Sequence, residues 1–333
     1  MQTFSGMQYV AIDIANHYGK DKLLWSERIQ WVKDNINCLE SLVYKAESPY
    51  QYEKAVNALR MAQRGEETGF IMSLDACSSG IQLMSALSGC KQGAKNCGLI
   101  NTGRRENFYG NVNNLMDSII GSNVSANFEY EDTKKAGMTV FYGSTYKPKS
   151  VFGENTPAYR AFYKALNSLA PGPMQLMKVM QSKWDSSAKE HTWVMPDKFF
   201  VRARVKEKID KRIEVDELNH ATFTHRAKVV LPANKGLSLA ANIIHSIDAW
   251  IVREMYRTAN RQKILISSIH DSFWCRPNDM NFIRKLYIEI LARIAKSNLI
   301  GDILNQIANE NKSYKKRSTD LHKYIMKSEY ALS

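Results

Sequence analysis

The stretch over residues 70–87 constrains the fold of this chain more than any other part of the sequence. Residues 70–75 (FIMSLD) form a short, mostly apolar run that predicts a buried strand ending on a carboxylate, Asp75. Five small residues follow, and residues 81–87 then have helical spacing. Asp75 is therefore expected at the carboxyl edge of a strand with little side-chain bulk around it. Such a position suits Mg²⁺, which keeps part of its water shell and takes one or two carboxylates; capping of the next helix is the alternative role.

A second stretch, over residues 263–274, supplies a matching carboxylate. Two short β-prone runs meet there at His270 and Asp271, which predicts a tight hairpin with an acid at its tip. Two strand-end carboxylates far apart in sequence could share one sheet. Asp75 and Asp271 would then form a two-metal clamp for in-line phosphoryl transfer, with ions about 3.5–4 Å apart.

Length and charge limit the classes of protein to which the chain can belong. Its 333 residues suggest about two domains and are enough for a substantial core. Lys and Arg number 46 against 33 Asp and Glu, giving a net charge of +13, and 16 tyrosines are interspersed with them. This excess favours nucleic acid as a partner, and a generally basic soluble protein is the alternative.

The cysteines and the apolar runs bear on the cellular compartment. Five cysteines without a CxxC pair argue against a zinc site or a disulfide framework and favour a reducing compartment. No apolar run approaches the roughly 18 residues of a membrane span. The first residues also lack the basic and apolar regions of a secretory signal. A cytoplasmic protein with no membrane partner is expected.

Helical patterns dominate the chain, so we expect a mainly helical α/β (α+β) fold. A helix over residues 7–17 is predicted to end near Gly19, Ser26 to cap a long helix through Leu42, and Ser48 to precede a third helix. Because the first helix begins almost at Met1, the chain is expected to start inside a larger fold. Further helices are predicted over residues 107–120, 157–181 with a break at 171–173, 238–260, 280–297 and 300–308. Residues 88–105 are predicted as a polar loop, and residues 312–317 as a solvent-facing basic segment.

Residues 131–144 form a helical pattern that ends at Gly143. Lys134, Met138 and Tyr142 fall on one broad face of this helix. A lysine, a tyrosine and an adjoining glycine suit a nucleotide, because the ammonium can meet phosphate while the ring meets base or sugar. The alternative is an amphipathic helix with an ordinary core tyrosine.

Between residues 192 and 231 the pattern changes to β. Strands are predicted over residues 199–205 and 213–215, joined by a charged tip at 206–212, and a further strand over 228–231. Basic residues that alternate along this ribbon suit a nucleic-acid groove, although a solvated hairpin face explains them almost as well.

In combination, these stretches resemble the single-subunit RNA polymerases of phages and mitochondria. Residues 75–82 (DACSSGIQ) resemble motif A of that family, residues 134–143 resemble motif B, and residues 270–273 (HDSF) resemble motif C. Weaker similarities follow the family's order at residues 26–29, 193–197, 245–248 and 328–333. The resemblance covers nearly the whole chain, but only the carboxyl-terminal part of the family's length.

The resemblance implies a right-handed polymerase fold. Its palm would comprise residues 1–103 and 246–333, and its inserted fingers residues 104–245, with a basic hairpin near 199–215 where relatives place a promoter-reading hairpin. The family's amino-terminal domain and thumb would be missing. Some phages divide this enzyme between two polypeptides, and this chain resembles the carboxyl-terminal, catalytic one. A second polypeptide carrying the other domains is therefore an expected partner.

The resemblance also assigns the metal site and the residues next to the substrate. Asp75, Asp271 and the Ala76 carbonyl would hold two Mg²⁺ ions, although the family usually has Gly at the position of Ala76. Lys134 would pair with the incoming phosphates, and Tyr142 would guard the insertion site.

Four further positions complete the expected substrate site. His245 would contact the ribose, and Met138 and Gly143 would adjoin the nucleotide. The family commonly has Arg where this chain has Tyr130, so phosphate neutralisation would rely on Lys135 or another Arg.

The implied function is that of a DNA-directed RNA polymerase. Its partners would be a DNA template, an RNA transcript and ribonucleoside triphosphates. It would act in the cytoplasm, which is the host's cytoplasm if the chain is phage-encoded. A related DNA polymerase is one alternative, but it would carry an acid soon after Asp75 and His-Asp-Glu at motif C, where Gln82 and Ser272 stand. A non-catalytic nucleic-acid-binding subunit is another. It would not need Asp75, Asp271 and the motif B residues together.

Overall fold

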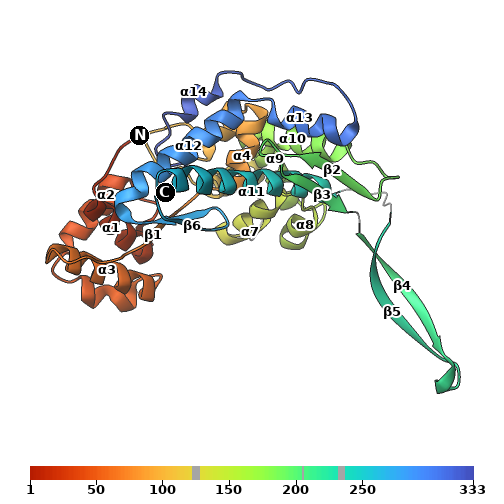
Figure 1. The fold of residues 1–333 in the computed structure, drawn as a ribbon, viewed down its shortest axis with the longest axis horizontal. Coiled ribbons are helices and arrows are strands. Elements are labelled where there is room, and N and C mark those ends of the chain that lie inside the picture. Colours follow the sequence, from red (N-terminus) through yellow and green to blue (C-terminus); the bar gives the residue numbers. More distant parts are fainter. Residues whose placement is uncertain (122–127, 205, 232–236) are drawn as a thin grey trace.

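The computed structural model describes residues 1–121, 128–204, 206–231 and 237–333. The fold is mainly helical with small antiparallel sheets, so the predicted α+β class is confirmed (Figure 1). The α-helices are α1 Gly6–Ala15, α2 Trp25–Asp34, α3 Pro49–Gln63, α4 Ser79–Ser88, α5 Lys91–Asn96, α6 Phe108–Ile120, α7 Tyr130–Val140, α8 Tyr146–Phe152, α9 Pro157–Leu169, α10 Pro171–Ser182, α11 Leu237–Arg261, α12 Met280–Lys296, α13 Leu299–Ala308 and α14 Leu321–Ile325. The strands are β1 Met72–Asp75, β2 Glu190–Val194, β3 Phe200–Arg204, β4 Lys206–Val215, β5 Ala221–Val230, β6 Ile266–Ile269 and β7 Ser272–Cys275.

A three-stranded antiparallel sheet joins the two stretches that the sequence singles out. Its strand order is β1-β7-β6, and the register pairs Leu74 with Phe273 and Asp75 with Ser272. Leu74 and Phe273 are both buried, because alternate residues of these short strands face the helices of the core. The predicted shared sheet is therefore confirmed.

Helices from distant parts of the chain pack around this sheet. α4 packs against α10 and α12, and α11 packs against the same two helices. α6 lies between α7 and α9, while α7 also contacts α8. The predicted break near residues 171–173 is confirmed, since α9 ends at Leu169 and Pro171 opens α10, where a proline without an amide hydrogen is tolerated. None of the described helices is both long and apolar enough to cross a membrane.

A long two-stranded hairpin, β4–β5, projects from the body (Figure 1). It turns after Leu218, where Asn219 and His220 adopt positive φ angles of 54° and 56°. The predicted tip at residues 206–212 is wrong, because these residues belong to strand β4. The opposite charges of Asp210 and Arg226 pair across the two strands at 2.7 Å, so a charged sequence here does not interrupt the ladder.

The rest of the predicted ribbon forms a separate hairpin. β3 pairs with β2, with Phe200 opposite Val194, rather than with residues 213–215. The strand predicted over residues 228–231 is the end of β5. Val205, which the sequence predicts as strand, lies outside the described residues.

The long helix predicted from Ser26 to Leu42 is also wrong. α2 starts earlier than predicted, at Trp25, because its N-cap is Leu24 and not Ser26: the Glu27 carboxylate accepts the Leu24 amide at 2.7 Å. It ends at Asp34, and the Asn35 side chain donates to the Trp31 carbonyl at 2.8 Å. Residues Leu39–Lys45 then form a 3₁₀ turn.

Two segments differ from their prediction as a polar loop and as a solvent-facing basic segment. The loop over residues 88–105 contains α5, whose first turn is capped by the Cys90 sulfur accepting the Gly93 amide. In the basic segment, Lys316 is half-buried and donates to the Ile294 and Ala295 carbonyls at 3.0 and 2.7 Å. The last carbonyls of α12 have no amide partner within the helix and attract this ammonium. The prediction that Lys316 faces solvent is therefore wrong.

Candidate active site

A cleft of about 1000 Å³ opens where the sheet, α4, α6, α7 and α11 meet. It brings together most of the candidate residues, which lie up to 196 positions apart in the sequence (271 − 75). These lining residues are Asp75, Ala76, Lys134, Met138, Tyr142, His245 and Asp271. Lys135 and Gly143 are not part of the described lining.

Asp75 and Asp271 lie next to each other at the edge of the sheet. The Ala76 amide donates to the Asp271 carbonyl at 3.2 Å, directly after the pair formed by Asp75 and Ser272. His270 takes a φ of 55° at the hairpin tip, which turns the chain sharply enough to present Asp271 beside β1. On the other side of β1, the Ser333 amide donates to the Asp75 carbonyl at 2.9 Å.

A third carboxylate, Asp248 of α11, lines the same cleft and is not among the residues predicted from the sequence. Burial, and after it the negative charge of Asp271, raises the pKa of Asp248 to about 7. Within the described part of the chain, Asp75, Asp248 and Asp271 have no ion-pair partner. Three carboxylates around one cleft that are not ion-paired with a protein cation fit the donor set that Mg²⁺ prefers, so the residues present are compatible with the expected metal.

Helix α7 contributes one cationic side chain to the cleft. Tyr130, Lys134 and Met138 are spaced four residues apart and all line it, as the helical period predicts. The Lys134 ammonium lies 3.7 Å from the Glu131 carboxylate, a loose and partly exposed pair that leaves its other donors available. Lys135 is exposed and points away from the described lining.

Tyr142 and His245 stand together on another wall of the cleft. Their ring centroids are 5.0 Å apart. The tyrosine ring rests on Gly80, where an added Cβ would lie 3.2 Å from ring atoms, so a larger residue would require the ring to shift. Burial raises the pKa of Tyr142 to about 12, and burial lowers the pKa of His245. Both groups are therefore neutral hydrogen-bonding partners near pH 7.

Gln82 lies beneath the cleft rather than in it. It is fully buried, and its carbonyl accepts the Tyr287 hydroxyl at 2.9 Å. Its amide group donates to the Cys97 and Ala331 carbonyls at 3.0 and 2.9 Å. With every partner internal, Gln82 holds motif A against α12 and the last residues of the chain.

Sequence reasoning also missed two cations of the cleft, Lys22 and Arg105. Both lie in loops, where no periodic pattern marks a side chain's direction. The residue that comes closest to indicating the position of Lys22 is Arg28. It is fully buried and donates to the Asp21 carbonyl at 2.6 Å and the Leu23 carbonyl at 3.0 Å. A buried arginine that binds the loop before its helix fixes the position of Lys22.

Comparison with known proteins identifies the family of the chain. A family model described as DNA-dependent RNA polymerase matches residues 2–151 and 154–331 of the chain. The chain belongs to this RNA polymerase family. The resemblance drawn from motifs A, B and C is thereby confirmed.

A similar protein from a phage is considerably longer than this chain. The DNA-directed RNA polymerase of Pseudomonas phage phiKMV is 22% identical over 333 aligned positions, which cover 83% of this chain and 41% of the phage protein. The chain thus spans about two fifths of the length of the curated relative it matches.

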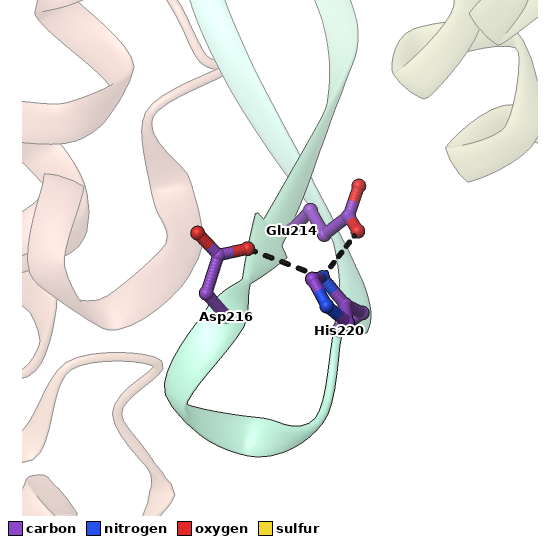
Figure 2. A group of neighbouring side chains, drawn as sticks. All are labelled: Glu214, Asp216 and His220. Carbon is purple, nitrogen blue, oxygen red and sulfur yellow. Dashed lines mark ion pairs between the residues drawn. The ribbon is translucent and has the colours of Figure 1, made fainter.

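In this polymerase-family chain, another group of potential metal ligands lies at the tip of the β4–β5 hairpin. Figure 2 shows His220 between Glu214 and Asp216, with its Nδ1 at 3.0 and 3.3 Å from their carboxylate oxygens. All three side chains are exposed, and mutual ion pairing accounts for their grouping. The cleft and the hairpin tip are separate places in the polymerase fold, and the predicted ligands Asp75 and Asp271 belong to the cleft.

Proposed function

We propose that this chain carries the catalytic centre of a DNA-directed RNA polymerase and transfers ribonucleotides to an RNA 3′-hydroxyl under the direction of a DNA template. One observation carries the proposal. Asp75 and Asp271 lie on adjacent strand ends and line one cleft. Lys134, Tyr142 and His245 line the same cleft. Paired carboxylates beside a cation and polar rings match the needs of phosphoryl transfer, which depends mainly on positioning and charge stabilisation.

In the proposed site Asp75, Asp271 and the Ala76 carbonyl would hold two Mg²⁺ ions. When bound, the metal would offset negative charge on the triphosphate and favour ionisation of the attacking hydroxyl. The chain's own contribution is to fix the two carboxylates on adjacent strands. Since backbone hydrogen bonds hold both strand ends, little reorganisation is needed when substrate arrives.

The remaining residues of the cleft bind and select the nucleotide. Lys134 pairs with the phosphates and is placed to give a proton to the leaving pyrophosphate. The Tyr142 hydroxyl and the His245 imidazole form a neutral polar pocket for the ribose 2′-hydroxyl, and Met138 gives the base an apolar contact. A substrate without that hydroxyl leaves these polar groups unpaired, which lowers its reaction rate.

At the level of domains, residues 1–103 and 246–333 would act as the palm, with residues 104–245 as fingers. The β4–β5 hairpin would contact promoter DNA.

We further propose that a second polypeptide supplies the thumb and amino-terminal domain. Co-purification of the tagged chain tests this: a stable complex is expected, whereas a monodisperse chain that makes long transcripts by itself would contradict it.

The function is tested by primer extension. The chain, with its partner where one co-purifies, is given an RNA primer on a DNA template, Mg²⁺ and either rNTPs or dNTPs. Template-dependent addition of ribonucleotides is expected. Preferential addition of deoxyribonucleotides would identify a DNA polymerase, and nucleic-acid binding without addition would identify a non-catalytic subunit.

A further inference from the structure

The lining of the cleft contains an arginine that the proposed mechanism has not used. Arg105 lies in the loop between α5 and α6, and its side chain is only 10% exposed. Among the described lining residues, the lysines and arginines are Lys22, Arg105 and Lys134. An arginine is costly to bury and must find partners there, so its contacts indicate its role.

The protein uses only part of the hydrogen-bonding capacity of Arg105. Its Nε donates to the Ser333 hydroxyl at 3.0 Å, and an Nη2 lies 3.9 Å from an Asp21 carboxylate oxygen. Within residues 1–121, 128–204, 206–231 and 237–333 no other polar contact engages this side chain. A guanidinium offers five N–H donors in a planar fork, so most of them remain available to a ligand in the cleft.

The surroundings of Arg105 are positively charged beyond what the protein neutralises. Asp21 is the carboxylate nearest to Arg105, and it also pairs with Lys22 and lies near Arg28. Burial would raise the pKa of Asp21, but the Lys22 hydrogen bond and the three cations lower it. Burial, and after it the charge of Arg105, lowers the pKa of Arg28 to about 10. Three cations therefore share the carboxylate of Asp21, and no other carboxylate of the described lining forms an ion pair with Arg105.

The neighbouring acid does not remove this excess. Glu106 also lines the cleft, but Arg104 donates to it at 3.0 Å and Thr102 at 2.7 Å. Arg104 itself is exposed and is absent from the described lining. Adjacent arginines thus differ, since Arg104 is neutralised by Glu106 whereas Arg105 faces the cleft.

Arg105 is also tied to the carboxylate edge of the sheet. Ser333 binds Arg105 through its hydroxyl and the Asp75 carbonyl through its amide. One residue therefore spans the distance between the guanidinium and the first proposed metal ligand. An anion bound at Arg105 would lie within the reaction site and not at its rim.

We propose that Arg105 is a phosphate-binding residue of this cleft, which grips the triphosphate of the incoming nucleotide together with Lys134. The proposal rests on the proposed function and deepens it. On α7 the residue one turn before Lys134 is the uncharged Tyr130, so that helix supplies one cation to a ligand with about four negative charges. Arg105 supplies a forked donor that suits phosphate oxygens.

Equilibrium binding to the full chain tests this, with ATP, AMP and inorganic pyrophosphate as probes and Ca²⁺ as the cation. Arg105→Gln is expected to weaken binding of ATP and pyrophosphate by roughly tenfold to a hundredfold while leaving AMP unchanged, because a charge-assisted hydrogen bond is lost. Arg105→Lys should retain part of the affinity. Arg276→Gln, at an exposed arginine outside the described lining, is the matched control and should bind all three probes normally.

Other outcomes overturn the proposal. If Ser333→Ala reproduces the loss, Arg105 acts only by holding the end of the chain. If Arg105→Gln weakens binding of a short single-stranded oligonucleotide but not of ATP, it contacts a strand phosphate instead. A wild-type chain that binds neither ATP nor pyrophosphate also contradicts it.

Melting temperatures close to wild type establish that the variants are folded, and Arg105→Lys decides the matter if the Gln variant is not. Arg105-dependent ATP binding without primer extension would leave this inference intact and remove the proposed function. Normal primer extension together with unchanged ATP affinity in Arg105→Gln would support the proposed function and contradict the role of Arg105.

Discussion

At the scale of single residues, the cleft combines side chains whose charge states are set by burial. Tyr142 and His245 are held neutral, while Asp248 has a pKa of about 7, raised by burial and then by Asp271. The ring of Tyr142 packs closely on Gly80, so a larger residue at that position would require the ring to shift. These environments make the Tyr142–His245 pair a hydrogen-bonding surface and not an ionic one.

Replacing Tyr142 with Phe should relax the choice of sugar. The ring and its packing on Gly80 remain, but the hydroxyl proposed to contact the ribose is lost, so the ratio of kcat/KM for rNTPs to that for dNTPs should fall roughly tenfold or more. Tyr146→Phe, an exposed tyrosine outside the cleft, is the control. An unchanged ratio in Tyr142→Phe would mean that this tyrosine serves only in packing.

At the scale of elements, the ends of helices are held by side chains that the sequence places in loops. Glu27 caps α2, the Cys90 sulfur caps α5, and Lys316 binds the last carbonyls of α12. Burial lowers the pKa of Lys316 to about 8 from an ordinary value near 10.5. Its charged form is therefore less favourable in the folded chain than in the unfolded chain.

This shift predicts a pH dependence of stability. Between about pH 8 and 10.5 the unfolded chain binds the Lys316 proton more than the folded chain does, so the contribution of Lys316 is fully present above pH 10.5 and is lost as pH falls through about 8. The free energy of unfolding of wild type minus that of Lys316→Met should rise over this interval. Lys315→Met, at an exposed neighbour, should show no such trend. A flat difference for Lys316→Met would contradict the assignment.

At the scale of the whole molecule, the chain divides into a packed body and a projecting hairpin. The body has one continuous core, whereas β4 and β5 chiefly contact each other (Figure 1). The hairpin's exposed apolar side chains include Ile213 and Phe223, and the Glu214–Asp216–His220 ion pairs lie at its tip. A ribbon built in this way adds little to the stability of the body.

Replacing residues 206–230 with a short Gly-Ser linker should therefore leave the melting temperature within a few degrees of wild type. In the proposed enzyme the deletion should abolish initiation at a promoter while extension of a primed template continues. Thermal melting and paired initiation and extension assays measure these effects. Cooperative unfolding at a much lower temperature would show that the hairpin is part of the core, and normal promoter use would remove its proposed role.

Several features of the fold and site could be predicted from local sequence patterns. Asp75 and Asp271 each follow a short β-prone run, and an acid at the end of a strand keeps its position whatever surrounds it. The face of α7 that carries Lys134 and Met138 follows from the helical period alone. The motifs of the family then predict that these elements meet.

Other features depend on contacts that no local pattern contains. The turn at Asn219 and His220 needs positive φ angles, while the charged run before it is compatible with either a strand or a tip. Arg105 lies in a loop without a periodic pattern, and its hydrogen bond to Ser333, 228 residues later, joins parts of the chain that no local pattern relates. Lys135 is adjacent to Lys134 in sequence, yet one residue of helical rotation takes it out of the described lining.

In the proposed enzyme, two carboxylates from distant parts of the chain, Asp75 and Asp271, form one site for nucleotide addition. The most direct measurement is the rate of single-nucleotide extension of an RNA primer by Asp75→Asn, Asp271→Asn and the double variant, with Asp279→Asn, outside the cleft, as the matched control. Each single variant should lose activity on the order of a thousandfold or more while still binding template, and the double variant should be little worse because the two residues act as a unit. Near-normal extension by either single variant, or losses that multiply in the double variant, would contradict the claim.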